Sequence, residues 1–157
     1  MVEWGRIINI GWRFALAFFL LCTLSGCLPL ATSLDTDRVA RVIDGDTIIL
    51  SGGERVRYIG IDTPEMDPEE PFAVQATQAN RELVEGKPVR LERDVSETDK
   101  YGRLLRYIWV DEKLVNLELV RLGLAEAKAY PPDVRYQSLL DAAETEAKLT
   151  GRGMWRK

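Results

Sequence analysis

From position 39 onward, short apolar runs are separated by polar turn residues, and this pattern predicts three consecutive strands. β-branched residues are frequent in Val39–Ile43 and Thr47–Leu50, and the Asp44-Gly45 pair between them is typical of a turn. A second turn over 51–54 leads into a third strand over Arg55–Ile61. Because both connections are short, we expect an antiparallel meander.

Three later segments have the apolar spacing of helices. The first covers Phe72–Val84, and a shorter one covers Leu114–Leu122. For the last helix we expect Asp133 as the N-cap and Gly151 at the end. Its apolar stripe runs through Tyr136, Leu140, Ala143 and Ala147.

Two further strands, over 89–92 and Leu104–Val110, complete the pattern. Five short strands with a helix between the third and the fourth predict an α+β, mainly β fold: a five-stranded OB-fold barrel with three packed helices. Another α+β arrangement fits the pattern equally well at this point. OB barrels bind single-stranded nucleic acid and oligosaccharides, so the fold permits such a function without proving it.

The N-terminal segment has the features of a targeting signal. Arg6 and Arg13 supply positive charge, and the apolar run over Phe14–Leu24 is too short to span a bilayer comfortably. Leu24-Ser25-Gly26-Cys27 resembles the lipobox of bacterial lipoproteins, in which the cysteine is lipidated and becomes the first mature residue. An uncleaved single-pass anchor starting near Ile7, or a cleaved signal with an incidental cysteine, remains an alternative.

This signal divides the chain into three predicted parts. We expect residues 1–26 to be a lipoprotein signal peptide, 27–37 a polar tether lipidated at Cys27, and 38–157 one folded domain. The protein would then be secreted through the inner membrane. It would stay lipid-anchored to a bacterial membrane on the extracytoplasmic side, facing the periplasm or the cell surface.

The amino-acid composition limits the kinds of catalytic and metal site that the chain can form. The chain has no histidine, and its two cysteines are Cys22 and Cys27. These counts exclude a serine–histidine–aspartate triad and histidine metal ligands, and they argue against a soft-metal site. A general base near neutral pH is then a carboxylate, a lysine of lowered pKa or a metal-bound hydroxide. Any metal is expected to be a hard cation with oxygen ligands.

The net charge of −4 argues against a broad attraction to nucleic acid. Proteins that bind nucleic acid are basic on at least one face. Any attracting field must therefore be local. A soluble acidic domain with no nucleic-acid partner remains an alternative on this point.

Three short segments, 44–47, 57–65 and 99–103, carry the candidate chemistry. Asp46 and Asp62 stand at strand ends, on loops that can converge around a hard cation. A backbone carbonyl and water would complete the ligand shell. A single aspartate of this kind is more often a turn former or a cap, so the prediction depends on the segments acting together.

The same segments supply a base and two phosphate partners. Glu65 is a carboxylate that can accept a proton from an attacking water. Arg57 and Arg103 carry guanidinium groups, which match phosphate oxygens and stay charged. The set predicts metal-assisted phosphodiester hydrolysis. The general acid stays open among Lys100, Tyr101 and a metal-bound water.

These segments closely resemble the staphylococcal nuclease (thermonuclease) family over about Arg38–Trp155. The resemblance extends to Leu114-Val115-Asn116, Leu119-Val120-Arg121, Gly123-Leu124-Ala125 and Gly153-Met154-Trp155. It implies that residues 38–157 form a thermonuclease-like OB-fold domain. It also implies a calcium-dependent endonuclease that cleaves DNA and RNA and leaves 3′-phosphates.

The resemblance also implies a role for each site residue. The implied Ca²⁺ ligands are Asp46, Asp62 and Thr63 (through its carbonyl), with Asp44 in the outer shell. The implied catalytic residues are Glu65 as the base and Arg57 and Arg103 at the phosphate. The implied substrate-binding residues are Lys100 and Tyr101 at the terminal phosphate and Tyr130 as a base-stacking platform.

Two departures distinguish this chain from the family pattern. The segment after Gly123-Leu124-Ala125 is shorter and keeps one tyrosine, Tyr130, where the family usually has two. The loop after Glu65 is acidic over 67–70. We therefore expect weaker substrate affinity at physiological salt, with the chemistry intact.

The rival interpretation is a non-catalytic OB-fold lipoprotein that binds nucleic acid or another anion, but such a protein has no need for Glu65. A structural lipoprotein of the cell envelope would leave the three segments unexplained. We expect DNA and/or RNA as substrate, a membrane contact through the lipid, no protein partner and a monomer.

Overall fold

The computed structural model of the chain describes residues 36–157. The predicted signal peptide, the predicted lipidation site at Cys27 and most of the predicted tether lie outside these residues. In the described part of the chain, no helix combines the length and the apolar character that crossing a membrane requires.

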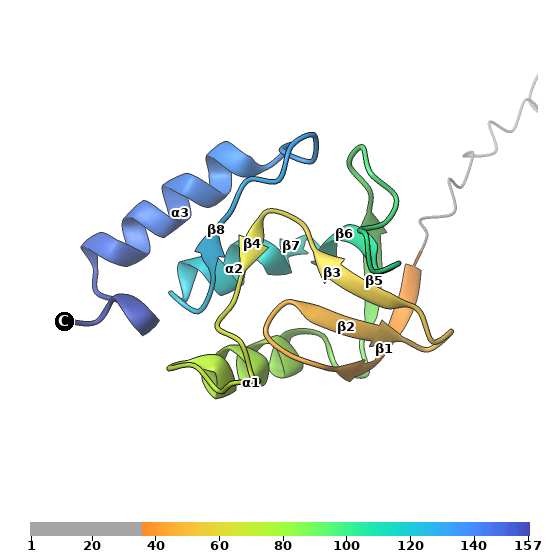
Figure 1. Cartoon of the computed structure of the whole chain (residues 1–157), viewed down its shortest axis with the longest axis horizontal. Coiled ribbons are helices and arrows are strands. Elements are labelled where there is room, and N and C mark those ends of the chain that lie inside the picture. The colour runs from red at the N-terminus through yellow and green to blue at the C-terminus, as the bar shows by residue number, and fades with distance from the viewer. Residues whose placement is uncertain (1–35) are drawn as a thin grey trace, which may run out of the picture. The chain divides into compact units, whose positions relative to one another are not determined.

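Five strands close into a barrel (Figure 1), which confirms the predicted α+β fold with an OB-type barrel. They are β1 (Thr36–Val42), β2 (Thr47–Leu50), β3 (Arg55–Tyr58), β5 (Pro88–Glu92) and β6 (Leu104–Val110). Neighbours pair antiparallel in the order β3-β2-β1-β5-β6, and a parallel pairing of β3 with β6 closes the barrel. β1 begins at Thr36, ahead of its predicted start at Val39.

Three two-residue strands accompany the barrel: β4 (Ile61–Asp62), β7 (Lys113–Leu114) and β8 (Glu126–Ala127). β7 pairs with the end of β6. β4 and β8 form a separate antiparallel pair, with Asp62 opposite Glu126. This small sheet places the segment after β8 beside a candidate metal ligand.

The described residues form three α-helices, as predicted. They are α1 (Ala73–Val84), α2 (Val115–Arg121) and α3 (Gln137–Leu149), and a 3-10 turn, η1 (Gly153–Trp155), follows α3. α2 packs against α1, α3 and β6. Figure 1 shows α2 between the other two helices, so the helices form one layer held to the barrel.

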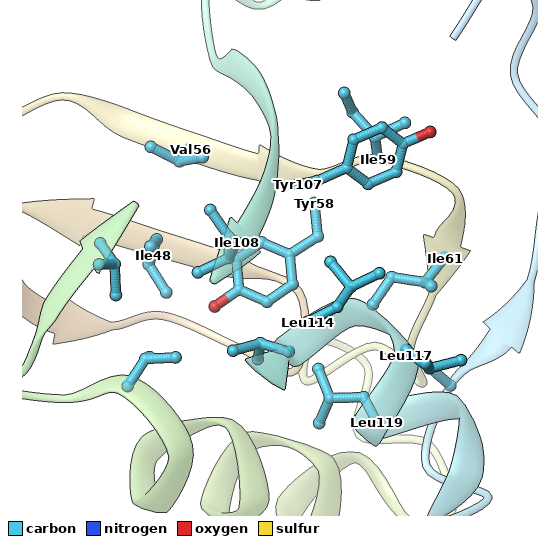
Figure 2. Packing of buried hydrophobic residues seen from close by; sticks show 14 of the residues in the cluster. Ile48, Val56, Tyr58, Ile59, Ile61, Tyr107, Ile108, Leu114, Leu117 and Leu119 are labelled. Carbon is cyan, nitrogen blue, oxygen red and sulfur yellow. The ribbon is translucent and has the colours of Figure 1, made fainter. Parts of the chain in front are cut away.

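Apolar side chains fill the barrel interior. Ile48 on β2 and Val56 and Tyr58 on β3 meet Ile108 on β6 (Figure 2), and each is at most 1% exposed. α2 adds Leu119, which is fully buried. Burying one such side chain contributes about 1.5–3 kcal/mol to the stability of the fold. The barrel is therefore a stable scaffold for the loops that carry the candidate site.

Asn80 on α1 joins the barrel to the loop after β1. It is fully buried, and its side-chain oxygen accepts a hydrogen bond from the Tyr58 hydroxyl (2.8 Å). Its amide nitrogen donates to the Asp44 carbonyl (3.0 Å). Because an unpaired buried polar group costs about 1–3 kcal/mol, these bonds fix α1 and the Asp44 loop to each other.

The third strand is shorter than predicted, because β3 ends at Tyr58 and not at Ile61. Ile59 and Ile61 are both buried along with Tyr58, which breaks the expected alternation. Gly60 turns the chain with a φ of +78°, and a Cβ there would lie 2.6 Å from Leu140 Cδ1. The turn separates β3 from β4 and redirects the chain toward β8.

Asp133 is not the N-cap of the last helix, contrary to prediction. α3 begins at Gln137, its N-cap position is Tyr136, and no side chain caps it. Asp133 Oδ1 instead accepts hydrogen bonds from the backbone N–H groups of Val95 (2.9 Å) and Ser96 (2.8 Å). Burial raises the Asp133 pKa, but these hydrogen bonds outweigh burial and leave the pKa below its usual value.

Candidate active site

Two aspartates from different loops converge on one guanidinium. Arg57 extends from β3, and its Nη1 contacts Asp46 Oδ1 at the entry to β2. Its Nη2 lies 2.6 Å from Asp62 Oδ1 on β4. Asp46 is 5% exposed. The structure therefore brings both predicted metal carboxylates and one predicted phosphate ligand to a single point.

The second oxygen of Asp46 is held by Thr63. Asp46 Oδ2 accepts hydrogen bonds from the Thr63 N–H (2.9 Å) and hydroxyl (3.0 Å). Gly45 is required here, because a Cβ at that position would lie 2.6 Å from Thr63 Oγ1. The loop after β1 and the segment after β4 thus pack directly against each other.

Asp44 also lies in this loop. Its Oδ1 accepts a hydrogen bond from the Asp46 N–H (3.0 Å), so it orients Asp46 from behind. Burial raises the pKa of the Asp44 carboxyl, and hydrogen bonds from Thr47 and the charge of Arg57 only partly offset the rise. The contacts of Asp44 are those of a residue that supports Asp46.

Lys128 was not recognised in the sequence. It follows β8, and its Nζ lies 2.6 Å from Asp62 Oδ2. This hydrogen bond, with a smaller contribution from Tyr130, raises the Lys128 pKa above its usual value, so the ammonium stays charged. The contact joins residues 66 positions apart and depends on the pairing of β4 with β8, which no local sequence pattern indicates.

The predicted substrate-binding residues surround one pocket of about 510 Å³. Its lining includes Arg57, Arg103, Lys100, Tyr101 and Tyr130. The wall therefore combines three cationic side chains with aromatic rings, a combination that suits phosphate and base recognition.

Asp99 shapes the loop that carries Arg103. Its Oδ1 accepts hydrogen bonds from the N–H groups of Tyr101 (2.9 Å) and Arg103 (3.0 Å), and its Oδ2 lies 2.7 Å from Arg103 Nε. Burial raises the Asp99 pKa, but the hydrogen bonds from Arg103 and Tyr101 outweigh it and leave the pKa low. Tyr101 remains 72% exposed, with Lys100 Nζ 4.9 Å from its ring centre.

Glu65 lies outside this contact network. It is exposed on the loop between β4 and α1, and in the described residues its side chain makes no hydrogen bond. Its backbone N–H donates to Glu70 Oε2 (3.0 Å), and the Glu70 N–H donates to its carbonyl (2.9 Å). The backbone is therefore held three residues after Asp62 while the carboxylate faces solvent.

The donor chemistry fits a hard divalent cation. Within residues 36–157, no three histidine, cysteine, aspartate or glutamate residues cluster as a metal site would require. Asp46 and Asp62 instead offer two carboxylates that converge on a positive charge, and the Thr63 carbonyl is adjacent in the chain. Two carboxylates, a carbonyl and waters form a normal shell for such an ion.

Comparison with known proteins identifies the family of the chain. The profile of the family described as "Staphylococcal nuclease homologue" matches residues 55–157. The Thermonuclease of Staphylococcus intermedius is 41% identical over 126 residues, which cover 76% of this chain and 75% of that protein. Endonuclease YncB of Bacillus subtilis is 40% identical over 126 residues, 74% of this chain and 60% of that protein. The chain therefore belongs to the staphylococcal nuclease family and is a nuclease, a hydrolase of phosphodiester bonds.

Proposed function

We propose that this nuclease is a calcium-dependent endonuclease that cleaves DNA and/or RNA and leaves 3′-phosphates. The observation that carries the proposal is the position of Arg57, which lines the substrate pocket and also touches Asp46 and Asp62. Family membership supports a metal requirement, and hard oxygen donors favour calcium. When bound, such an ion would polarise the phosphate and the attacking water.

The protein side chains would share the remaining work. Arg57 and Arg103 would stabilise the charge that grows on the phosphate oxygens. Glu65 would accept the proton of the attacking water, and breaking the bond to the 5′ oxygen would leave the phosphate on the 3′ side. Lys100 and Tyr101 would hold a neighbouring phosphate, and both remain candidates for protonating the leaving oxygen.

The test uses purified protein and an end-labelled single-stranded DNA, with calcium and then with a calcium chelator. We expect cleavage with calcium only, and fragments that gain a 3′-hydroxyl after phosphatase treatment. Glu65→Gln should lower kcat by about 10²–10⁴-fold. Glu69→Gln in the same exposed loop is the matched control and should keep the kcat of the parent protein. Equal cleavage by all samples, chelated ones included, would refute the mechanism.

We further propose that the enzyme acts outside the cytoplasm as a lipoprotein anchored through Cys27. The short apolar run before the Leu24-Ser25-Gly26-Cys27 sequence supports this proposal. Cys27→Ser should move the protein from the membrane fraction to the soluble fraction. Retention in the membrane would favour the uncleaved anchor.

A further inference from the structure

The backbone holds Lys128 beside Asp62. Ile61 pairs with Ala127 in the β4–β8 ladder, and the Lys128 N–H donates to the Gly60 carbonyl (2.9 Å). From this fixed backbone the side chain reaches Asp62 Oδ2 (2.6 Å) and lies 5.7 Å from the centre of the Tyr130 ring. The contact therefore follows from the fold of this segment.

Every oxygen of the two carboxylates already has a cationic or hydrogen-bonding partner. Asp46 Oδ2 is held by Thr63, and one oxygen of each aspartate faces Arg57. Lys128 occupies the fourth oxygen, Asp62 Oδ2. Two carboxylates thus face two cationic side chains, Arg57 and Lys128.

We propose that Lys128 is a built-in counter-cation of Asp62 that competes with the divalent ion and so sets the affinity of the site for it. The inference rests on the proposed calcium role of Asp46 and Asp62. A divalent ion bound at Oδ2 would share this oxygen with the Lys128 ammonium, whose positive charge repels the ion, so ion binding favours release of Lys128. A monovalent ion offers Asp62 no more charge than the ammonium it would replace, so the contact also selects for divalent ions.

The size of the effect follows from exposure. The Lys128 side chain is 48% exposed and Asp62 is 29% exposed, so solvent screens the pair. Pairs of this kind correspond to a change in an equilibrium constant of up to about fivefold. The competition therefore tunes metal affinity and does not abolish binding.

Calorimetric titration of calcium into the purified protein tests the inference. Lys128→Met should bind calcium more tightly than the parent protein, by up to about fivefold. Lys113→Met, which removes the same charge from the exposed residue of β7, is the control and should bind like the parent. Binding by Lys128→Met that is equal to or weaker than the parent's would overturn the competition while leaving the calcium site intact. Absence of binding by every protein would overturn the calcium site itself.

A second measurement needs no variant. Lysine acylation, followed by mass spectrometry of the peptide that contains Lys128, reports how free its amine is. Calcium should increase acylation at Lys128 and leave Lys113 unchanged, because ligation of Asp62 releases the ammonium. Acylation of Lys128 that is unchanged at saturating calcium would show that the amine is not displaced, and the inference would fail.

Discussion

The two arginines of the site are positioned in opposite ways. Arg57 is held by residues from two other segments, Asp46 and Asp62, and its side chain is 13% exposed. Arg103 is held by Asp99, four residues earlier in the same turn, and its side chain is 27% exposed. The position of Arg57 depends on the whole barrel, whereas that of Arg103 depends on one loop. Both line the same pocket, so replacing either arginine should impair catalysis. Only the replacement of Arg57 should also lower the stability of the fold strongly.

Replacing Arg57 should produce the largest effect. Arg57→Gln leaves Asp46 buried and facing Asp62 without a cation between them. We expect kcat to fall by at least about 10²-fold. The free energy of unfolding should fall by about 3 kcal/mol, the low end for breaking a buried ion pair, because Asp62 is partly exposed. Urea unfolding without calcium measures the loss, and the exposed Arg41→Gln is the control. An unfolding free energy equal to that of the parent protein would show that Arg57 contributes no more to stability than Arg103 does.

Arg103→Gln should separate catalysis from stability. The kcat should fall by about 10²–10³-fold, because a phosphate contact is lost. The free energy of unfolding should change by no more than about 1 kcal/mol, since the pair with Asp99 is local and partly exposed. Activity and urea unfolding of one preparation suffice for this comparison. A stability loss as large as that of Arg57→Gln would show that the loop is part of the cooperative core.

The Asp99 turn should also respond to acid. Its pKa is below the usual 3.8 in the folded protein, so the ionised carboxylate favours folding. This contribution is fully present above the unfolded pKa and is lost as pH falls through the folded value. We expect the stability advantage of the parent over Asp99→Asn, about 1 kcal/mol or less at neutral pH, to shrink below about pH 4. If chemical unfolding shows a constant stability difference between the two proteins across that pH range, the stabilising role of the ionised Asp99 carboxylate is wrong.

The acidic loop should give the smallest effect. Asp67 and Glu69 are exposed beside Glu65 and repel a polyanion without touching the pocket lining. Asp67→Lys with Glu69→Lys should lower KM by about two- to fivefold at physiological salt and leave kcat unchanged. The gain should disappear at high salt, where the field is screened. A lower KM that persists at high salt would indicate direct contacts between the new lysines and the substrate.

The barrel and the two arginines were within reach of sequence reasoning. Strand alternation, the Asp44-Gly45 turn and the Leu104–Val110 run each have a local cause, and Leu104–Val110 matches β6. Arg103 could be selected because it follows the Tyr101-Gly102 turn, and Arg57 because its segment continues to Asp62 and Glu65.

The remaining features depend on contacts between distant segments. Gly60 ends β3 because the chain must turn where Leu140 packs, which the strand pattern does not reveal. Asp133 has the residue type of a cap but binds the N–H groups of Val95 and Ser96. Nothing in the local sequence distinguishes Lys128 from other surface lysines. Its place beside Asp62 depends on the pairing of β8 with β4.

The hydrogen bonds of Asn80 have a consequence for heat inactivation. One amide side chain connects a helix, a barrel tyrosine and the carbonyl of Asp44, in the loop that also carries Asp46. The helix cannot fray at this point without releasing that loop. A thermally loosened enzyme should therefore lose its activity at the temperature at which α1 melts, with no active intermediate in between.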